Sequence, residues 1–433
     1  MMKRARILLL GLIIPLLSGC AATYVAAYPA ILEGTPAATA QWTPSPIPAA
    51  VLTATPSPTP APTPEPPAVA TVGFIGDILM MTSQIENAEL PGGGYDFSHS
   101  FEPMRPLFEG MDLMCGNFEC TLAGEDAGYT RPRSTPPPPT EEDPAPTAPY
   151  QTFNAPDELA KDLFDAGFDV LTTANNHCID RDQEGLFRTI AVLRAAGLMT
   201  TGTFRSEQER QTPLTVDVNG IKVCIVAATA SVNRKDGRLT DEAREYAVCR
   251  LYDERLQADI AACREAGAEF IIVCPHWGTE YESGHSSKQE KLAKELIAMG
   301  ADAIIGSHPH VVQPIEWVTA ERDGAEVTAP VVYSLGNFVS NMSPSPRDQG
   351  LFVKLILTRE AEGSPVTAEL EYLPTLCIRQ KVDKRTLHQV LPCYLDPSLI
   401  TAAAPLDGGD HEKLDRARAH VIKVAGEAFP PLG

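Results

Sequence analysis

Hydrophobic and polar positions repeat in one arrangement three times along the chain. Each copy consists of an amphipathic helix, a glycine stop, a short continuous apolar strand and a polar cluster. The copies are "NAPDELAKDLFDAG" with "FDVLTTA" and "NNH", "DERLQADIAACREAG" with "AEFIIVCP" and "HWG", and "SSKQEKLAKELIAMG" with "ADAIIG" and "SHPH". Asn154 is the predicted N-cap of the first helix, and Gly167, Gly267 and Gly300 are the predicted left-handed helix terminators.

The repeated units predict an α/β fold in which helices cover parallel strands. Two more strand-like segments fit this pattern: "TVGFIGD", which ends at Asp77, and "APVVYSLGNF", which ends at Asn337. After Gly350 the segments "LFVKLILT" and "AELEYLPTL" predict an antiparallel hairpin, and "DHEKLDRARAHVIKVAGEAF" predicts a last helix. Because parallel strands end on the same side, we expect the polar clusters to converge on one sheet edge.

The first residues, "MMKRARILLLGLIIPLLSGC", have a basic start and an apolar run, which predicts a secretory signal over residues 1–19. Cys20 resembles the lipidated cysteine of bacterial lipoproteins, with an ordinary cleaved signal as the alternative. Residues 20–68 are rich in Pro, Thr and Ala and predict a solvated tether. These features place one folded domain, residues 69–433 with a Pro-rich surface loop at 131–149, on the outer face of the bacterial membrane.

The formal net charge of the chain is −21. A nucleic acid would be repelled over most approach directions, which argues against it as a partner. A local cationic site such as a bound metal can still attract an anion.

The cysteines match no disulfide or zinc-thiolate framework. Nine remain after Cys20, and Cys224 and Cys274 lie in apolar strand-like runs, where they are predicted to be small core residues. Two pairings are open in an oxidising exterior: Cys115 with Cys120, and Cys377 with Cys393.

The polar clusters at the strand ends contain residue types that ligate metals or contact phosphate. In chain order the candidates are Asp77, Asn117, Glu119, Asn175, Asn176, His177, His276, His308, His310 and Asn337. Imidazole, carboxylate and amide oxygen without thiolates suit Mn, Fe, Zn or a similar divalent ion. Each residue alone also fits a turn, a cap or a structural hydrogen bond, and Trp277 fits packing. The joint pattern favours a site for one or two ions.

The motifs "GDILM", "GNFECTL", "NNHCID", "HWGTEY", "GSHPHVVQP" and "YSLGNF" resemble the ordered motifs of the CapA family, the poly-gamma-glutamate capsule synthesis proteins. The resemblance covers about residues 72–372. The fold of that family is similar to that of calcineurin-like metallophosphoesterases. The resemblance therefore implies a layered sandwich of two mainly parallel or mixed sheets flanked by helices.

The resemblance also implies roles for individual residues. The implied metal ligands are Asp77, Glu119, Asn176, His276, His308 and His310, with His308 and His310 serving one ion each. His177 matches the imidazole that protonates a leaving group beside two ions that activate a water molecule. Leu79 stands where the superfamily has a histidine ligand, and Asn117 stands where it has aspartate. A single-metal site, an altered two-metal site and a non-hydrolytic site all stay open.

Three functions are compatible with these residues. The first is a cell-surface lipoprotein for synthesis, export or anchoring of an anionic polymer such as poly-γ-glutamate, with a membrane ligase or export complex as partner. The second is a secreted metal-dependent phosphoesterase that acts on a phosphate-containing substrate. The third is a scaffold of a polymer export complex that uses its metal for structure alone.

Overall fold

The computed structural model describes residues 66–130, 151–394 and 400–432. The predicted signal at 1–19, the Cys20 anchor, the insert at 131–149 and nearly all of the predicted tether lie outside the described residues. The first strand begins at Ala68.

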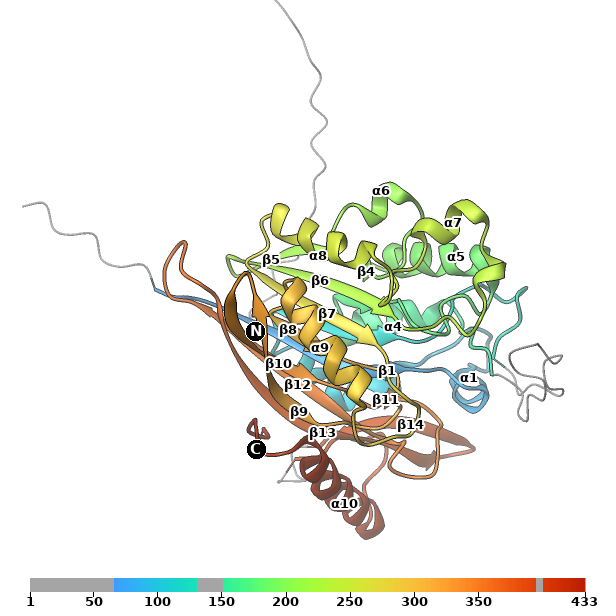
Figure 1. The fold of residues 1–433 in the computed structure, drawn as a ribbon. Helices are drawn as coiled ribbons and strands as arrows, with labels where there is room; N and C mark the ends of the chain where they lie inside the picture. Colours follow the sequence, from blue (N-terminus) through green and yellow to red (C-terminus); the bar gives the residue numbers. More distant parts are fainter. Residues whose placement is uncertain (1–65, 131–150, 395–399, 433) are drawn as a thin grey trace, which may run out of the picture. The chain divides into compact units, whose positions relative to one another are not determined.

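The described residues form two mixed β-sheets (Figure 1). In the first sheet β1 to β4 run parallel, whereas β12, β13 and β14 add antiparallel strands on the other side of β1. Its order is β14 (Arg385–Pro392), β13 (Thr367–Val382), β12 (Gln349–Arg359), β1 (Ala68–Ile78), β2 (Leu113–Phe118), β3 (Val170–Thr172) and β4 (Met199–Thr201), with β11 (Asn337–Val339) beside β1.

In the second sheet β6, β7, β8 and β10 run parallel, and an antiparallel strand borders each end. Its order is β5 (Thr215–Val218), β6 (Ile221–Thr229), β7 (Phe270–His276), β8 (Ala303–Ile305), β10 (Ala325–Val332) and β9 (Ile315–Arg322). The predicted sandwich of two mixed sheets is confirmed.

Helices cover the outer faces of both sheets (Figure 1). The helices of the described residues are α1 (Thr82–Ala88), α2 (Ser98–Phe101), α3 (Arg105–Phe108), α4 (Glu158–Ala166), α5 (Asp182–Ala195), α6 (Glu207–Arg210), α7 (Asp241–Tyr246), α8 (Arg255–Glu265), α9 (Ser287–Met299) and α10 (Gly408–Ala425). Of these, α1 to α5 pack on the first sheet and α8 and α9 on the second. Among the helices of the described residues, none has the length and apolar character needed to cross a bilayer.

Alternating side chains explain why the central strands are apolar throughout. On β6, Val223 and Ile225 point into the core between the sheets, while Cys224 and Val226 point toward the core beneath α8 and α9. Because a strand sends successive side chains to opposite faces, a strand covered on both faces needs an unbroken apolar run. Packing on both faces fixes the position of the strand ends that carry the polar clusters.

The three helix–strand units and the antiparallel hairpin occur as predicted, and Gly167, Gly267 and Gly300 all have positive φ angles. The predicted N-cap at Asn154 is wrong. The helix begins at Glu158 after Asp157, and the Asn154 side chain instead bonds the loop at 123–128.

The segment "APVVYSLGNF" is also not one strand. β10 ends at Val332, and the chain then crosses to the other sheet, where β11 begins at Asn337. This crossing brings the "GNF" motif beside Asp77 of β1, with which Asn337 is in register.

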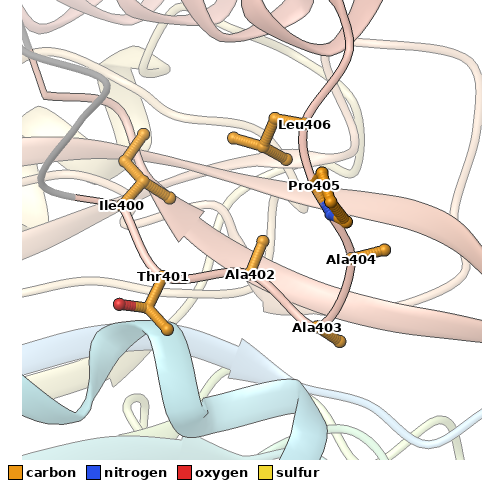
Figure 2. Close-up of a pocket in the computed structure, with 7 residues that line it drawn as sticks. All are labelled: Ile400, Thr401, Ala402, Ala403, Ala404, Pro405 and Leu406. Carbon is orange, nitrogen blue, oxygen red and sulfur yellow. The ribbon is translucent and has the colours of Figure 1, made fainter.

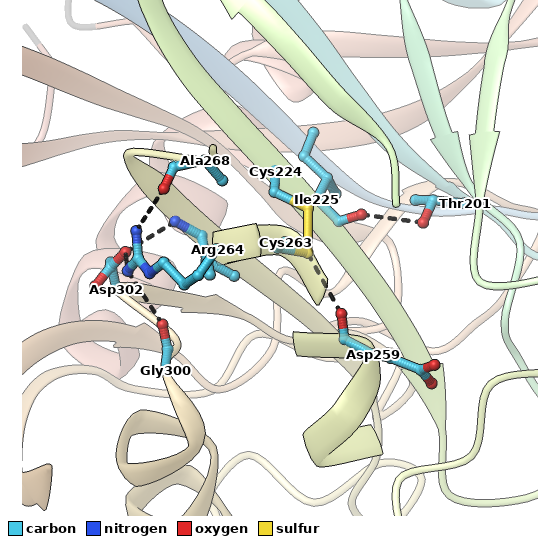
Figure 3. The surroundings of a disulfide bond; sticks show 10 residues. Thr201, Cys224, Ile225, Asp259, Cys263, Arg264, Ala268, Gly300 and Asp302 are labelled. Atoms are coloured by element: carbon cyan, nitrogen blue, oxygen red, sulfur yellow. Dashed lines mark hydrogen bonds and ion pairs between the residues drawn. A yellow bond between two sulfur atoms is a disulfide. The ribbon is translucent and has the colours of Figure 1, made fainter. Parts of the chain in front are cut away.

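A disulfide joins Cys224 of β6 to Cys263 of α8, with 5.9 Å between the Cα atoms (Figure 3). Cys224 is a buried core residue, as predicted, but its disulfide was not foreseen, because α8 packs a second cysteine directly over this strand. Cys274 is a free buried thiol, as predicted. The two suggested pairings do not form: Cys115, Cys120, Cys377 and Cys393 are all free and buried.

Candidate metal centre

The candidate ligands come together from both sheets. In the first sheet, Asp77 is the penultimate residue of β1 and Glu119 follows β2. In the second sheet, His276 ends β7 and the His308–His310 turn follows β8. The prediction of a single sheet edge is thus corrected. The carboxyl ends of two facing sheets meet, which lets carboxylates from one sheet oppose imidazoles from the other.

One group of donor atoms surrounds His276 Nε2. Asn176 Oδ1 lies 3.0 Å from this nitrogen, His308 Nδ1 lies 3.0 Å from it, and Glu119 Oε1 lies 3.5 Å from it. The other ring nitrogen of His276, Nδ1, lies 3.0 Å from Ser307 Oγ, which orients the imidazole. Glu119, His276 and His308 can each offer one ligand atom to a common cation.

A second group surrounds Asp77 and His310. Asp77 Oδ2 lies 3.2 Å from His310 Nδ1, and Glu119 Oε1 lies 3.9 Å from His310 Nε2. Asn337 Oδ1 lies 3.0 Å from His310 Nδ1. Asp77, Glu119 and His310 form the second triad that can hold a cation. His308 and His310 thus belong to different triads, and Glu119 belongs to both.

The buried carboxylates show whether a metal fits here. Asp77 and Glu119 are both fully buried, and Asp77 Oδ2 and both carboxylate oxygens of Glu119 have no hydrogen-bond donor. Burial, followed by the charge of Asp77, raises the pKa of Glu119 well above its usual range. Two adjacent buried carboxyl groups without donors are costly unless a cation compensates them, so the donor set fits one or two divalent ions.

His276 and His308 also fit neutral ligands. Burial, followed by His308 and His310, lowers the pKa of His276 well below its usual value, and burial with His310 lowers the pKa of His308 to about 4. Burial would lower the pKa of His310, but the adjacent Asp77 carboxylate outweighs burial, so the pKa of His310 is raised. An uncharged imidazole is the form that binds a metal.

The His308–His310 turn has a left-handed backbone at both histidines. His308 has a φ of 99° and His310 a φ of 59°, both in the left-handed region that non-glycine residues rarely adopt. Tyr281 N–H donates to Pro309 O at 2.7 Å and ties the turn to the loop after β7. The surrounding contacts hold two strained residues so that each ring enters a different triad.

The other asparagines have mainly orienting contacts. Asn117 Nδ2 donates to Asp77 Oδ1 at 2.7 Å, and Asn175 uses its side chain to bond Phe118 O and the His177 N–H. Leu79 is fully buried in the core beneath α1 and α2. The position that carries a histidine in the phosphoesterase pattern is thus part of the apolar core in this chain.

His177 forms a buried chain of contacts beside the two triads. Its Nδ1 lies 2.8 Å from Asp180 Oδ2, while Lys235 Nζ pairs with Asp180 Oδ1. Phe153 N–H also donates to Asp180 Oδ2, and the Phe153 ring packs edge-on against His177. Burial raises the pKa of Asp180, but the His177 and Lys235 contacts outweigh it, so the net shift is downward. An ionised Asp180 favours the proton on His177 Nδ1 and leaves Nε2 available.

Gly76 shows how tightly the strand ends are packed. A Cβ at this position would lie 1.9 Å from Gly336 O, the oxygen that accepts the Asp77 N–H. We expect Gly76→Ala to lower the free energy of unfolding by about 1–3 kcal/mol and to weaken metal binding, as measured by urea denaturation and metal titration. Gly237→Ala, where a Cβ meets nothing within 4 Å, is the control and should change neither. Equal stability of the two variants would contradict this reading.

A hollow elsewhere on the domain is lined by residues 400–406 (Figure 2). Its side chains are Ile, Thr, Ala, Pro and Leu, and they offer no charged group and no imidazole. It has no part in the metal centre.

Comparison with known proteins identifies the family. The model of the bacterial capsule synthesis protein family PGA_cap matches residues 71–342. The chain belongs to this family. It is 28% identical over 280 residues to the capsule biosynthesis protein CapA of Bacillus anthracis, covering 62% of this chain and 59% of that protein. It is 25% identical to the PGA biosynthesis protein CapA of Bacillus subtilis (strain 168), covering 68% of this chain and 70% of that protein.

Two further comparisons are more distant. A probable polyglutamine synthesis accessory protein of Mycobacterium tuberculosis is 24% identical over 228 residues, which cover 50% of this chain and 57% of that protein. A crystal structure of a Thermus thermophilus protein matches with a TM-score of 0.30 and 10% identity, over 69% of this chain and 98% of that one. At this TM-score the likeness carries no argument. The chain spans about three fifths of the length of the Bacillus anthracis relative.

The sequence did not single out several residues that surround the site. Asp180 lies three positions after His177 in "NNHCID", so a local signal existed. Tyr281 is the last residue of the "HWGTEY" motif, so it also had a local signal. Lys235 and Arg347 carried none, because each reaches the site from a separate loop.

Proposed function

We propose that this PGA_cap family protein acts in the biosynthesis of an anionic capsule polymer of the poly-γ-glutamate type through a metal-dependent, hydrolase-like site. The observation that carries the proposal is the pair of largely buried triads that share Glu119. The names of the two Bacillus relatives support the process, since they describe capsule and PGA biosynthesis. Lipidated Cys20 would anchor the protein to the extracellular face of the cell membrane, near a polymer ligase or export complex.

The residues of the site would have two separate roles, metal binding and proton transfer. Asp77, Glu119 and His310 would hold one ion, and Glu119, Asn176, His276 and His308 would hold the other. Bound ions supply Lewis-acid chemistry and a nucleophile at neutral pH. The imidazolium form of His177, held by Asp180 through its Nδ1–H, could give the proton on Nε2 to a leaving group. The Phe153 ring and the burial of His177 limit access of water to that proton.

Hydrolysis by the purified full-length protein tests the proposal. With Mn²⁺, we expect the protein to shorten poly-γ-glutamate of defined length, and we expect His276→Ala to reduce the rate about 100-fold or more because a ligand imidazole is lost. His411→Ala, on α10, is the matched control and should be neutral. A metal-loaded protein that leaves both the polymer and a chromogenic phosphodiester intact would rule out a hydrolytic site.

Two alternatives are supported by separate observations. A phosphoesterase is favoured by the His177–Asp180 pair, since an alkoxide leaving group needs a proton donor. Cleavage of the phosphodiester but not of the polymer would establish it. A scaffold that uses metal for structure is favoured by the buried Leu79 in place of a ligand. In that case metal removal would lower the melting temperature with no activity to lose.

A further inference from the structure

We propose that Arg347, stacked on Tyr281, is a subsite for a carboxylate of the substrate beside the candidate metal centre. The inference rests on the proposed function, because it names the group of the polymer that this part of the site would bind. It concerns two residues that are not metal ligands in either triad.

Tyr281 and Arg347 are joined to the metal centre by side chain and backbone. The Tyr281 ring centre lies 6.0 Å from that of His310, and the guanidinium carbon of Arg347 lies 3.6 Å from the centre of the Tyr281 ring. Asn337, which contacts His310 Nδ1 through Oδ1, donates from Nδ2 to Arg347 O at 2.8 Å. One aromatic ring therefore separates the guanidinium from a candidate ligand, and the backbone of Arg347 is tied to the same histidine.

The guanidinium has most of its hydrogen-bonding capacity unused. Among the described residues, Arg347 forms one side-chain hydrogen bond, from Nη1 to Ser343 O at 3.4 Å, and no ion pair with a carboxylate. Arginine carries five N–H donors in a planar fork, and stacking on an aromatic face leaves the edge of that fork open. In a chain with a net charge of −21, an unpaired and partly buried cation beside the centre is well placed to draw in an anion.

The surroundings favour a carboxylate over a phosphate dianion. Burial, followed by the charge of Glu280, raises the pKa of Tyr281 to about 12, so Glu280 adds negative charge next to the ring. Because Glu280 already offsets part of the charge of Arg347, the guanidinium is better matched to a substrate group with one negative charge than to a phosphate dianion with two. A poly-γ-glutamate chain carries one carboxylate on each residue, so a bidentate Arg347 contact would fix the residue that flanks the bond at the metal centre.

Binding of a fluorescently labelled poly-γ-glutamate oligomer tests the subsite without turnover. Anisotropy is measured on the full-length protein in EDTA, at low and moderate salt. We expect Arg347→Met to weaken binding about 10- to 100-fold, the loss expected when hydrogen bonds to a charged group are removed. Arg347→Lys should bind about 10-fold more weakly than wild type, because the ammonium keeps the charge without the fork. Tyr281→Phe should bind normally and Tyr281→Ala more weakly, since stacking needs only the ring.

Arg416→Met is the matched control, because Arg416 is an exposed arginine on α10 that pairs with Glu412. Equal binding by wild type and Arg347→Met would overturn the subsite while leaving the proposed function intact. Loss of inorganic phosphate binding in Arg347→Met, with no oligomer binding by wild type, would overturn the carboxylate assignment. Failure of wild type to bind the oligomer or phosphate in EDTA, together with failure to bind Mn²⁺ in a separate titration without EDTA, would overturn both the subsite and the proposed function. Thermal melts confirm that each variant is folded.

Discussion

The Glu119→Gln protein is expected to bind no divalent metal, whereas the wild-type protein binds two equivalents. Glu119 is the member shared by the two triads, so its substitution removes one anionic ligand from each ion at once. His308→Ala and His310→Ala each alter one triad, and each should lose one equivalent. The glutamine keeps the shape of the buried side chain, which separates loss of charge from loss of packing.

Metal content and stability measure this result together. Saturating metal at about 1,000 times its Kd should stabilise the wild type by about 4 kcal/mol, and Glu119→Gln should lose that gain. Burial raises the pKa of Glu119, so the metal-free wild type and variant should have similar melting temperatures. Glu86→Gln, on an exposed face of α1, is the control. If the wild type binds one equivalent of metal, Leu79 leaves the triad of Asp77, Glu119 and His310 one ligand short. If the Glu119→Gln protein still binds two ions, Glu119 is not a ligand shared by both.

The Asp180→Asn protein is expected to be less stable than wild type by about 3–5 kcal/mol at neutral pH, the usual cost of breaking a buried ion pair. Asp180 is fully buried in its side chain, and Lys235 is nine-tenths buried. Removing the carboxylate leaves the ammonium without its partner, and it also weakens the hold on His177. Urea denaturation measures the difference.

The pH dependence of that difference follows from the lowered pKa of Asp180. A depressed folded-state pKa contributes stability above the unfolded-state value of about 4. This contribution is lost as the pH falls through the folded-state pKa, so the two proteins should converge in acid. Asp165→Asn, which breaks an exposed pair with Lys161, is the control and should cost under about 1 kcal/mol. Asp180→Asn with Lys235→Met should recover part of the loss, and purely additive effects would contradict a coupled pair.

Local patterns predicted those elements whose causes are local. The "DERLQADIAACREAG" and "SSKQEKLAKELIAMG" helices, their glycine terminators and the strands after them depend on neighbours a few residues away. The hairpin after Gly350 was readable for the same reason, because alternating side chains and a turn signal lie within one short segment. The predicted N-cap at Asn154 is wrong because its side chain accepts a hydrogen bond from Ala123, in a loop that is distant in sequence.

Long-range contacts decided the rest. The disulfide between Cys224 and Cys263 and the buried Asp180–Lys235 ion pair each join two segments that are far apart in sequence. No local sequence pattern predicts that these segments are in contact. The approach of Arg347 to Tyr281 likewise depends on where two loops cross.

The sequence by itself determined which residues have the chemistry of metal ligands and that they follow strands of an α/β fold. Asp77, Glu119, His276, His308 and His310 could all be named from residue type and position at strand ends. Only the tertiary structure decided that these strands belong to two sheets, that Glu119 faces both histidine groups and that Leu79 lies in the core. The physical reason is that residue type sets what a side chain can bind, whereas the packing of one sheet against the other sets what it meets.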